Sequence, residues 1–285
     1  MRTERFISML VLFFCAMGFT ACSDDDEKGI TPLSFEKEHY EVPLFEGAST
    51  KSITIKGGNK DYTATVEKPE ILEASINTSS TTEMGYLLIN PKQKGETTVT
   101  VKDNVSNETV DLSIKVTDGY LAYVIKESNH PALAVGTIAY LINNEAKDCY
   151  FFLDNHVGNN LYGTPIGEGT YSFSVKAEDN ADGSSPSYIA YLTLNYREGK
   201  NGAFTDAAIA PTPHELRLDS PSQLLTNVLQ TYLGVDWEEL KREATPQKRD
   251  SPAPLPTLRM TIDNTDYAII GILNMTPTIP ENILK

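Results

Sequence analysis

Alternating apolar and polar residues mark several strands in the first part of the chain. Ile53 and Ile55 are separated by a polar residue, and so are Val99 and Val101. Thr109–Val116 continues the pattern, with an apolar residue at every second position. Runs with this period of two are typical of half-buried antiparallel strands. Glycine and asparagine residues between the runs predict turns, so this part is predicted to form a β-sandwich.

Further strand candidates follow residue 118, and several of them are apolar on both faces. Ile138–Ile142 contains only apolar and aromatic residues. Such runs suit the central strands of a sandwich or the wall of a barrel. Strands and helices do not alternate, so a parallel doubly wound sheet is not expected. The candidates are Tyr120–Lys126, Val135–Ile142, Cys149–Leu153, Thr170–Lys176, Tyr188–Asn195, Glu215–Leu218, Leu258–Ile262 and Tyr267–Leu273.

A helical segment is expected late in this second part. Pro221 suits the first turn of a helix, and Gly234 suits its C-terminal cap. Asp236 can begin a second short helix, so we expect helices near residues 221–233 and 237–244. The apolar stripe of the first helix is expected to pack on the sheet rather than bind a partner helix. The stripe consists of Leu224, Leu225, Val228, Leu229, Tyr232 and Leu233.

The expected fold class is therefore all-β, with two domains. Residues 31–117 are expected to form a β-sandwich. Residues 118–285 are expected to form a larger antiparallel β-sandwich or barrel-like domain with a short helical insertion. The strand pattern is compatible with both architectures for this second domain.

The N-terminal segment has the features of a secretory signal peptide. Arg2 and Arg5 supply a positive n-region, and Phe6–Phe19 supplies an apolar h-region. A transmembrane helix needs roughly 18 to 20 apolar residues, whereas this run is shorter and is interrupted by Ser8. Residues 1–21 are therefore expected to be cleaved.

The end of this segment, Phe19-Thr20-Ala21-Cys22, resembles the lipobox of bacterial lipoproteins. The usual motif has Leu at the position of Phe19 and a small residue at the position of Thr20, and the looser pattern resembles lipoproteins of Bacteroidota-type outer membranes. The resemblance implies that Cys22 is acylated and becomes the mature N-terminus. A multiply acylated cysteine would anchor the chain to a membrane durably.

An acidic run follows the cysteine. Ser23–Glu27 resembles the export signals of surface-displayed lipoproteins in that group, although a short acidic run also suits a solvated linker. Residues 22–30 are expected to be a tether. The implied location is the outer membrane, with the cell exterior favoured over the periplasmic leaflet.

Two segments of the predicted sandwich resemble bacterial Ig-like (BIG-like) domains. Ile53–Tyr62 is similar to their B strand and the turn after it, and Lys94–Asp103 is similar to a later strand of these domains. The resemblance implies an Ig-like sandwich over residues 31–117. Such domains usually serve as spacers or adhesion modules. Ile166–Phe173 resembles a strand start in lipoproteins of unknown function.

The charge of the chain excludes some partners. It carries 24 Lys and Arg residues against 39 Asp and Glu residues, a formal net charge of −15 at pH 7. Such a charge disfavours electrostatic binding to nucleic acid or to an anionic membrane surface.

The chain has three cysteines. Cys15 lies in the expected signal peptide, and Cys22 is the expected acylation site. Cys149 lies in an apolar strand candidate and is expected to be a buried, unreactive thiol. No intrachain disulfide is expected.

No pattern of residues indicates catalysis. The four histidines lie far apart without zinc-site spacing, and no nucleophile elbow or phosphate-binding glycine loop occurs. No cofactor and no metal are therefore expected, and the chain is not expected to be an enzyme. A hydrolase with a pair of carboxylates is kept as a less favoured alternative, because sequence alone does not reveal such a pair.

One loop combines an aromatic ring with hydrogen-bonding side chains. Sugars bind such mixtures, because their C–H faces pack on rings while their hydroxyl groups need polar partners. An ordinary Gly/Asn-rich loop is the alternative interpretation. The candidate ligand-binding residues are Asn155, His156, Asn159, Asn160 and Tyr162.

The function expected from these features is that of a lipid-anchored, non-enzymatic surface lipoprotein. Its C-terminal domain would bind a glycan or a surface protein. The alternative is a structural or assembly subunit of a surface complex or fimbria.

Overall fold

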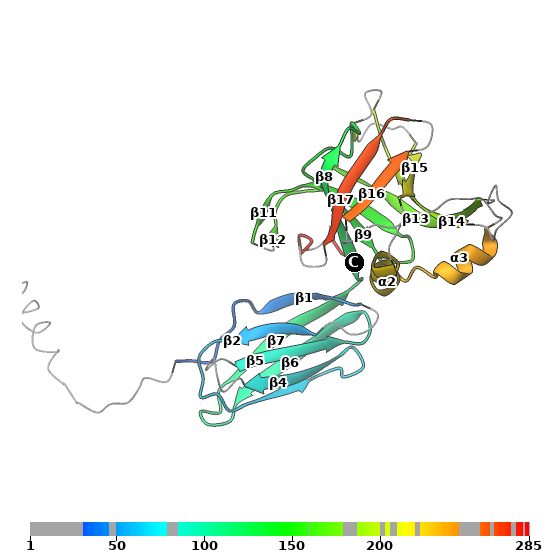
Figure 1. The fold of residues 1–285 in the computed structure, drawn as a ribbon. Helices are drawn as coiled ribbons and strands as arrows, with labels where there is room; N and C mark the ends of the chain where they lie inside the picture. Colours follow the sequence, from blue (N-terminus) through cyan, green and yellow to red (C-terminus); the bar gives the residue numbers. More distant parts are fainter. Residues whose placement is uncertain are drawn as a thin grey trace, which may run out of the picture.

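A computed structural model describes residues 31–45, 50–78, 85–158, 160–178, 187–199, 203–205, 210–219, 223–244, 257–262, 265–274, 278–281 and 283–284. The described chain is mostly β and forms two assemblies joined end to end, a pair of sheets and a barrel (Figure 1). The predicted signal peptide, Cys22 and the tether lie outside the described residues.

The first assembly, which we call the two-sheet unit, contains the strands β1 (His39–Pro43), β2 (Lys51–Ile55), β3 (Tyr62–Val66), β4 (Leu72–Thr78), β5 (Gly85–Pro91), β6 (Gly95–Asp103) and β7 (Thr109–Thr117). One sheet has the order β1-β7-β6-β3 and the other has the order β2-β5-β4. β1 pairs with β7 in parallel, and the other pairs are antiparallel.

Both sheets contribute side chains to one hydrophobic core. Ile53 and Ile55 face inward from β2, and Val99 and Val101 face inward from β6, as the alternation predicts. The polar residues between them lie on the outer faces. The two-sheet unit is therefore held together by apolar faces that meet between the sheets.

The chain enters the two-sheet unit at the end farthest from the barrel. The carbonyl of Thr31 accepts a hydrogen bond from the N–H of Gly58, and the N–H of Leu33 donates to the Glu108 carboxylate in the turn before β7. β7 then runs away from this turn for nine residues, roughly 30 Å, to the junction with the barrel. Residue 31 and the barrel thus lie at opposite ends of the unit.

The second assembly is a closed barrel of eight strands. Their order is β10-β13-β14-β15-β16-β17-β8-β9, and all neighbours pair antiparallel. Of the two architectures that the sequence allows for this part, the structure has the barrel. The strands are β8 (Tyr120–Ser128), β9 (Thr137–Ile142), β10 (Asp148–Leu153), β13 (Gly167–Glu178), β14 (Ser187–Tyr196), β15 (Thr212–Leu218), β16 (Thr257–Ile262) and β17 (Ala268–Asn274).

Several barrel strands are apolar on both faces because each face packs against a different core. Leu121 and Tyr123 of β8 point into the barrel interior, whereas Tyr120 and Ala122 belong to a second cluster on the outer face of β8, β9 and β10. Leu161 and the C-terminal residues Ile279 and Leu284 cover this outer cluster.

Two helices follow β15. α2 (Gln223–Leu233) buries Leu225, Leu229 and Leu233 in the barrel core cluster, so the stripe packs on the sheet as expected. Gly234 then has φ +66°, a left-handed conformation that favours glycine at a helix end. The predicted start of this helix, residues 220–222, lies outside the described residues.

The second helix, α3 (Trp237–Glu243), begins where Asp236 predicts it. The Asp236 carboxylate accepts hydrogen bonds from the N–H groups of Glu238 and Glu239. Neither described helix is long and apolar enough to cross a membrane. Cys149 is a free thiol in β10 and is fully buried, as its apolar surroundings in the sequence predict.

Candidate functional site

The described strands of the barrel enclose packed side chains. Tyr123, Phe151, Tyr171 and Tyr196 are buried in the core cluster of the barrel, and leucine side chains fill the space between them. An eight-stranded barrel can be filled by side chains or can hold one small ligand, and the buried rings favour the filled arrangement here. The outer surface of the barrel is therefore the favoured place for a functional site.

The candidate ligand-binding residues lie on and beside a short hairpin formed by β11 (His156–Val157) and β12 (Asn160–Leu161). The structure brings Asn155 and Tyr162 together, since the N–H of Tyr162 donates to the Asn155 carbonyl at 3.3 Å. Asn159, the remaining candidate, lies outside the described residues.

His156 is held in place by a neighbouring carboxylate. Its Nδ1 lies 2.6 Å from Oδ1 of Asp154, and its side chain is largely buried. When Nδ1 donates to the carboxylate, Nε2 of the neutral ring is a hydrogen-bond acceptor. This Nε2 atom is buried and has no hydrogen-bond partner among the described residues. His156 is therefore an anchoring side chain rather than an exposed contact.

Asn160 connects the hairpin to the C-terminal part of the chain. Its Oδ1 accepts a hydrogen bond from the Thr278 hydroxyl at 3.1 Å, and the two residues also form a parallel β-bridge. Leu161, the next residue, is buried in the outer cluster. Asn160 therefore positions the hairpin against the barrel.

Apolar side chains are exposed around the hairpin. Leu153 is 60% exposed, Val157 69%, Tyr162 54% and Ile166 37%. Together with Asn155, these four residues form what we call the hairpin surface. Sequence analysis identified only Asn155 and Tyr162 among them. The missed signal was the presence of valine and isoleucine in a segment rich in Asn, Gly and Pro, whose short hairpin leaves their side chains exposed.

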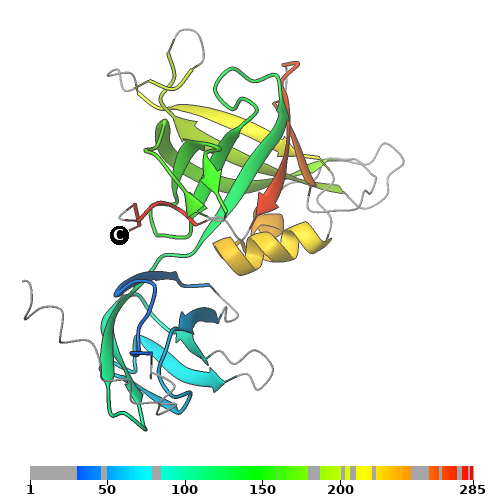
Figure 2. The same ribbon diagram turned by 90° about the vertical axis from the view of Figure 1, so that its left-hand side faces the viewer.

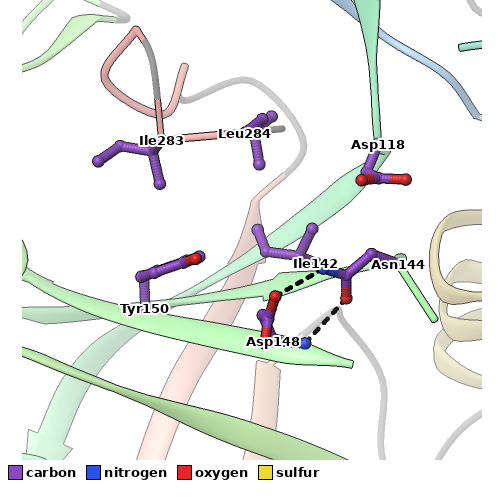
Figure 3. Close-up of a pocket in the computed structure, with 7 residues that line it drawn as sticks. All are labelled: Asp118, Ile142, Asn144, Asp148, Tyr150, Ile283 and Leu284. Carbon is purple, nitrogen blue, oxygen red and sulfur yellow. Dashed lines mark hydrogen bonds between the residues drawn. The ribbon is translucent and has the colours of Figure 1, made fainter. Parts of the chain in front are cut away.

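A pocket lies where the C-terminal segment meets the lower edge of the barrel (Figure 3). Its carboxylates already have partners. Asp118 accepts from Lys94 Nζ at 2.6 Å, and Asp148 accepts from the Asn144 amide at 2.7 Å. In the view of Figure 3, Asp118 lies above the Asn144–Asp148 pair, and Ile283 and Leu284 lie at the upper left. The remaining lining residues are Ile142, Tyr150, Ile283 and Leu284.

At the opposite end of the barrel, two histidines meet that are far apart in the sequence. The His214 ring stacks on Tyr196 at 4.2 Å between centroids, and the His130 ring meets it edge-on at 5.8 Å. His130 Nδ1 accepts hydrogen bonds from the N–H groups of Ala132 and Leu133.

Both histidines have lowered pKa values, which favour the neutral ring. Burial, together with the neighbouring His214, lowers the pKa of His130 to about 4. Burial also lowers the pKa of His214, and Glu198 opposes that change only partly. Neutral imidazoles could ligate a metal, but the described residues contain no group of three or more His, Cys, Asp or Glu side chains arranged to hold one. We interpret this cluster as structural.

No protein-family model and no curated protein matches the chain. Among solved structures, domains 4–9 of the surface layer protein SbsC are similar at 16% identity and a TM-score of 0.25, over 68% of this chain and 33% of that one. Domains 5–6 of the S-layer protein SbsC match at 16% identity and a TM-score of 0.25, over 66% and 96%. The chain therefore spans about a third of the first of these structures. TM-scores of this size establish no shared fold.

Proposed function

We propose that this chain is a lipid-anchored, non-enzymatic lipoprotein of the outer membrane, facing the cell exterior, and that its hairpin surface binds a glycan or protein ligand. The observation that carries the proposal is the end-to-end layout. The expected tether joins the two-sheet unit at residue 31, beside Gly58 and Glu108, and the barrel lies at the other end. Such a layout holds a binding domain away from the membrane.

We further propose that the two-sheet unit is an Ig-like spacer. Its sheets of four and three strands have the strand numbers of a constant-type immunoglobulin sandwich. The segments that resemble bacterial Ig-like domains fall on β2 with its following turn and on β6 with the turn before it. Gly57 and Gly58 in the first of these turns have φ values of +73° and +71°, which explains the glycine pair.

The filled barrel supports binding at the outer surface, and the hairpin surface offers two kinds of contact. The exposed Tyr162 ring beside Asn155 suits a sugar, because the ring can pack on C–H groups while the amide meets hydroxyl groups. The exposed aliphatic side chains Leu153 and Val157 suit an apolar patch on a protein.

A structural or assembly role in a surface complex is the second candidate. The exposed aliphatic side chains of the hairpin surface favour it, because permanent protein contacts bury such groups. A hydrolase is less favoured. The two carboxylates of the described pocket, Asp118 and Asp148, are already bound by Lys94 and Asn144.

Ligand binding is tested with the soluble chain that begins at Ser23. Affinity electrophoresis through gels containing dietary and host polysaccharides should retard the wild-type chain, and Tyr162→Ala should abolish the retardation. Tyr188→Ala is the matched control, because Tyr188 is 44% exposed at the start of β14. Equal retardation of both variants would remove the hairpin surface from the proposal.

If no polysaccharide retards the chain, the remaining candidate functions are binding of a protein ligand and the assembly role. These are tested by cross-linking on intact cells, with Val157→Asp as the variant. Loss of a cross-linked partner in Val157→Asp, but not in Tyr188→Ala, supports a protein ligand at this surface. An unchanged set of partners would contradict both roles.

Anchoring is tested separately by metabolic labelling with a clickable fatty acid. Cys22 should carry the label, and Cys22→Ser should lose both the label and the membrane association. Digestion of intact cells with a protease then distinguishes exterior display from the periplasmic leaflet. A wild-type chain without label would refute the anchor.

A further inference from the structure

The C-terminal residues 278–281, 283 and 284 contact both assemblies of the molecule. In the view of Figure 2, this segment lies on one side of the connection between the two-sheet unit and the barrel, and α2 lies on the other side. We call the segment the C-terminal clasp.

The clasp attaches to the barrel through apolar side chains. Ile279 and Leu284 are 7% and 4% exposed, and both belong to the cluster on the outer face of β8, β9 and β10. The Ile279 N–H also donates to the Tyr120 hydroxyl at 3.4 Å. The Thr278 hydroxyl adds a hydrogen bond to Asn160 at 3.1 Å, and the burial of the two aliphatic side chains completes the attachment.

The clasp attaches to the two-sheet unit through lysines. Lys37, just before β1, forms an ion pair with Glu281 at 2.7 Å, and this contact raises the pKa of Lys37. Lys115, in β7, donates to the Leu284 carbonyl at 3.0 Å and lies 3.4 Å from the Glu41 carboxylate. The Lys37 pair is exposed and contributes little by itself, whereas Lys115 is partly buried.

The other junction contacts of the described residues lie close to the connection between β7 and β8. Only Asp118 and Gly119 connect β7 to β8, and the Phe45 ring packs against Tyr120 and Tyr232 at 6.1 and 4.8 Å between centroids. Gly119 lies so close to Leu44 that a Cβ atom there would be 2.2 Å from the Leu44 carbonyl oxygen. Contacts gathered around one short connection leave the barrel able to rotate about it.

We propose that the C-terminal clasp locks the orientation of the barrel on the two-sheet unit. It supplies a second set of contacts, on the side away from α2, so the two sets together prevent rotation about the Asp118–Gly119 connection. Release of the clasp would leave both assemblies folded and free to reorient. This inference does not depend on any ligand of the hairpin surface.

The test measures the distance between the two assemblies by pulsed electron paramagnetic resonance. Spin labels are attached at Thr65→Cys in β3 and Glu127→Cys in β8, both exposed positions, in the soluble chain that begins at Ser23. Cys149 is fully buried and will not take up the label. The clasped chain should give a single narrow distance distribution.

The variant I279D/L284D places two carboxylates in the apolar cluster and should detach the clasp. Its distance distribution should broaden about twofold or more, because assemblies joined by a small interface move relative to one another. The control, Val135→Asp, adds a charge at a position that is 61% exposed in the loop after β8 and should leave the distribution narrow.

Circular dichroism establishes that each variant is folded. If I279D/L284D does not fold, I279A/L284A gives the same test, because alanine removes the contacts without adding charge. A folded double variant with the narrow distribution of the wild type would overturn the proposal.

Discussion

Tyr123 of β8 donates its hydroxyl to the carbonyl of Leu258 in β16, at 2.7 Å, across the strand that separates them. Gly271 of that strand, β17, makes the crossing possible. A Cβ atom at this position would lie 2.5 Å from Cζ of Tyr123. The ladder between β17 and β8 also shifts register at Ile270 and Gly271. The hydrogen bond of Tyr123 thus connects β8 to β16, and Gly271, beside the register shift in β17, leaves room for the ring between them.

Loss of this hydroxyl should destabilise the barrel. We expect Tyr123→Phe to lower the free energy of unfolding by about 1 to 2 kcal/mol, because the buried carbonyl loses its donor. Gly271→Ala should cost about 1 to 3 kcal/mol, since the methyl group collides with the ring. Urea denaturation measures both. Tyr188→Phe is the control at an exposed tyrosine, and equal stability of all three variants would contradict the finding.

Asp103 should make the two-sheet unit sensitive to acid. Burial opposes ionisation of this carboxyl, but hydrogen bonds from Val105, Asn59 and Ser106 outweigh it and lower its pKa. A lowered pKa stabilises the fold above the unfolded value of about 4, and this stability is lost as the pH falls through the folded value. Asp103→Asn should cost about 3 kcal/mol at pH 7.

The measurement for Asp103 is a series of urea denaturations from pH 7 down to pH 2.5. The Asp103→Asn variant should show a shallower loss of stability with acid than the wild type does. Asp111→Asn is the control, because Asp111 is exposed on β7. Parallel pH profiles for wild type and Asp103→Asn would refute the role of this carboxylate.

The barrel should lose stability between pH 6.5 and 4 because of His130. Its folded pKa, about 4, lies below the unfolded value, so protons bind the unfolded chain first. The free energy of unfolding is therefore highest above pH 6.5, and by pH 5 this histidine has lowered it by about 2 kcal/mol. Protonation of Nδ1 would also break the bonds from Ala132 and Leu133. Burial also lowers the pKa of His214, so this histidine likewise favours the folded state less as the pH falls.

Replacement of the ring separates this effect from general acid sensitivity. His130→Asn keeps an acceptor for the two N–H groups but does not titrate, so its stability should change less over this pH range. His39→Asn, at an exposed position, should behave like the wild type. A His130→Asn profile identical to the wild-type profile would contradict the prediction.

The N-cap of α3 can be followed through the only tryptophan of the chain. Trp237 is buried against Phe173, and its Nε1 donates to the Thr226 carbonyl at 3.0 Å. Asp236→Ala should destabilise α3 by about 1 kcal/mol, because two N–H groups lose their acceptor. Tryptophan fluorescence should shift to longer wavelength at lower urea concentration. An unshifted transition would show that Asp236 does not hold the helix.

Local patterns predicted the barrel strands but not the closure of the barrel. The sequence places β9 and β10 correctly because their residues are apolar on both faces. Closure depends on β17 pairing with β8, which lies far away in the sequence. The predicted start of β13 was late, at Thr170. Gly169 belongs to the strand because it pairs with Tyr196 and Cys149, and a Cβ atom there would lie 2.0 Å from the Asn195 carbonyl oxygen, so the position needs glycine.

The candidate site was predicted only in part, for a similar reason. An Asn/Gly-rich loop suggested exposure, which is correct for Asn155 and Tyr162. The hydrogen bond from the Thr278 hydroxyl to Asn160 could not be inferred, because the two residues come from distant segments of the sequence. Likewise, Ile279 follows a threonine- and proline-rich stretch that resembles an irregular tail, yet it completes the outer cluster.

The side chains packed inside the barrel affect where a ligand could bind to this molecule. Tyr123, Phe151 and Tyr196 are buried in the core of the barrel and occupy space between its described strands. The recognition that we propose uses exposed side chains of the hairpin surface, and replacing them removes little packing from the barrel. Substitutions at the hairpin surface can therefore change its specificity during evolution without destabilising the barrel.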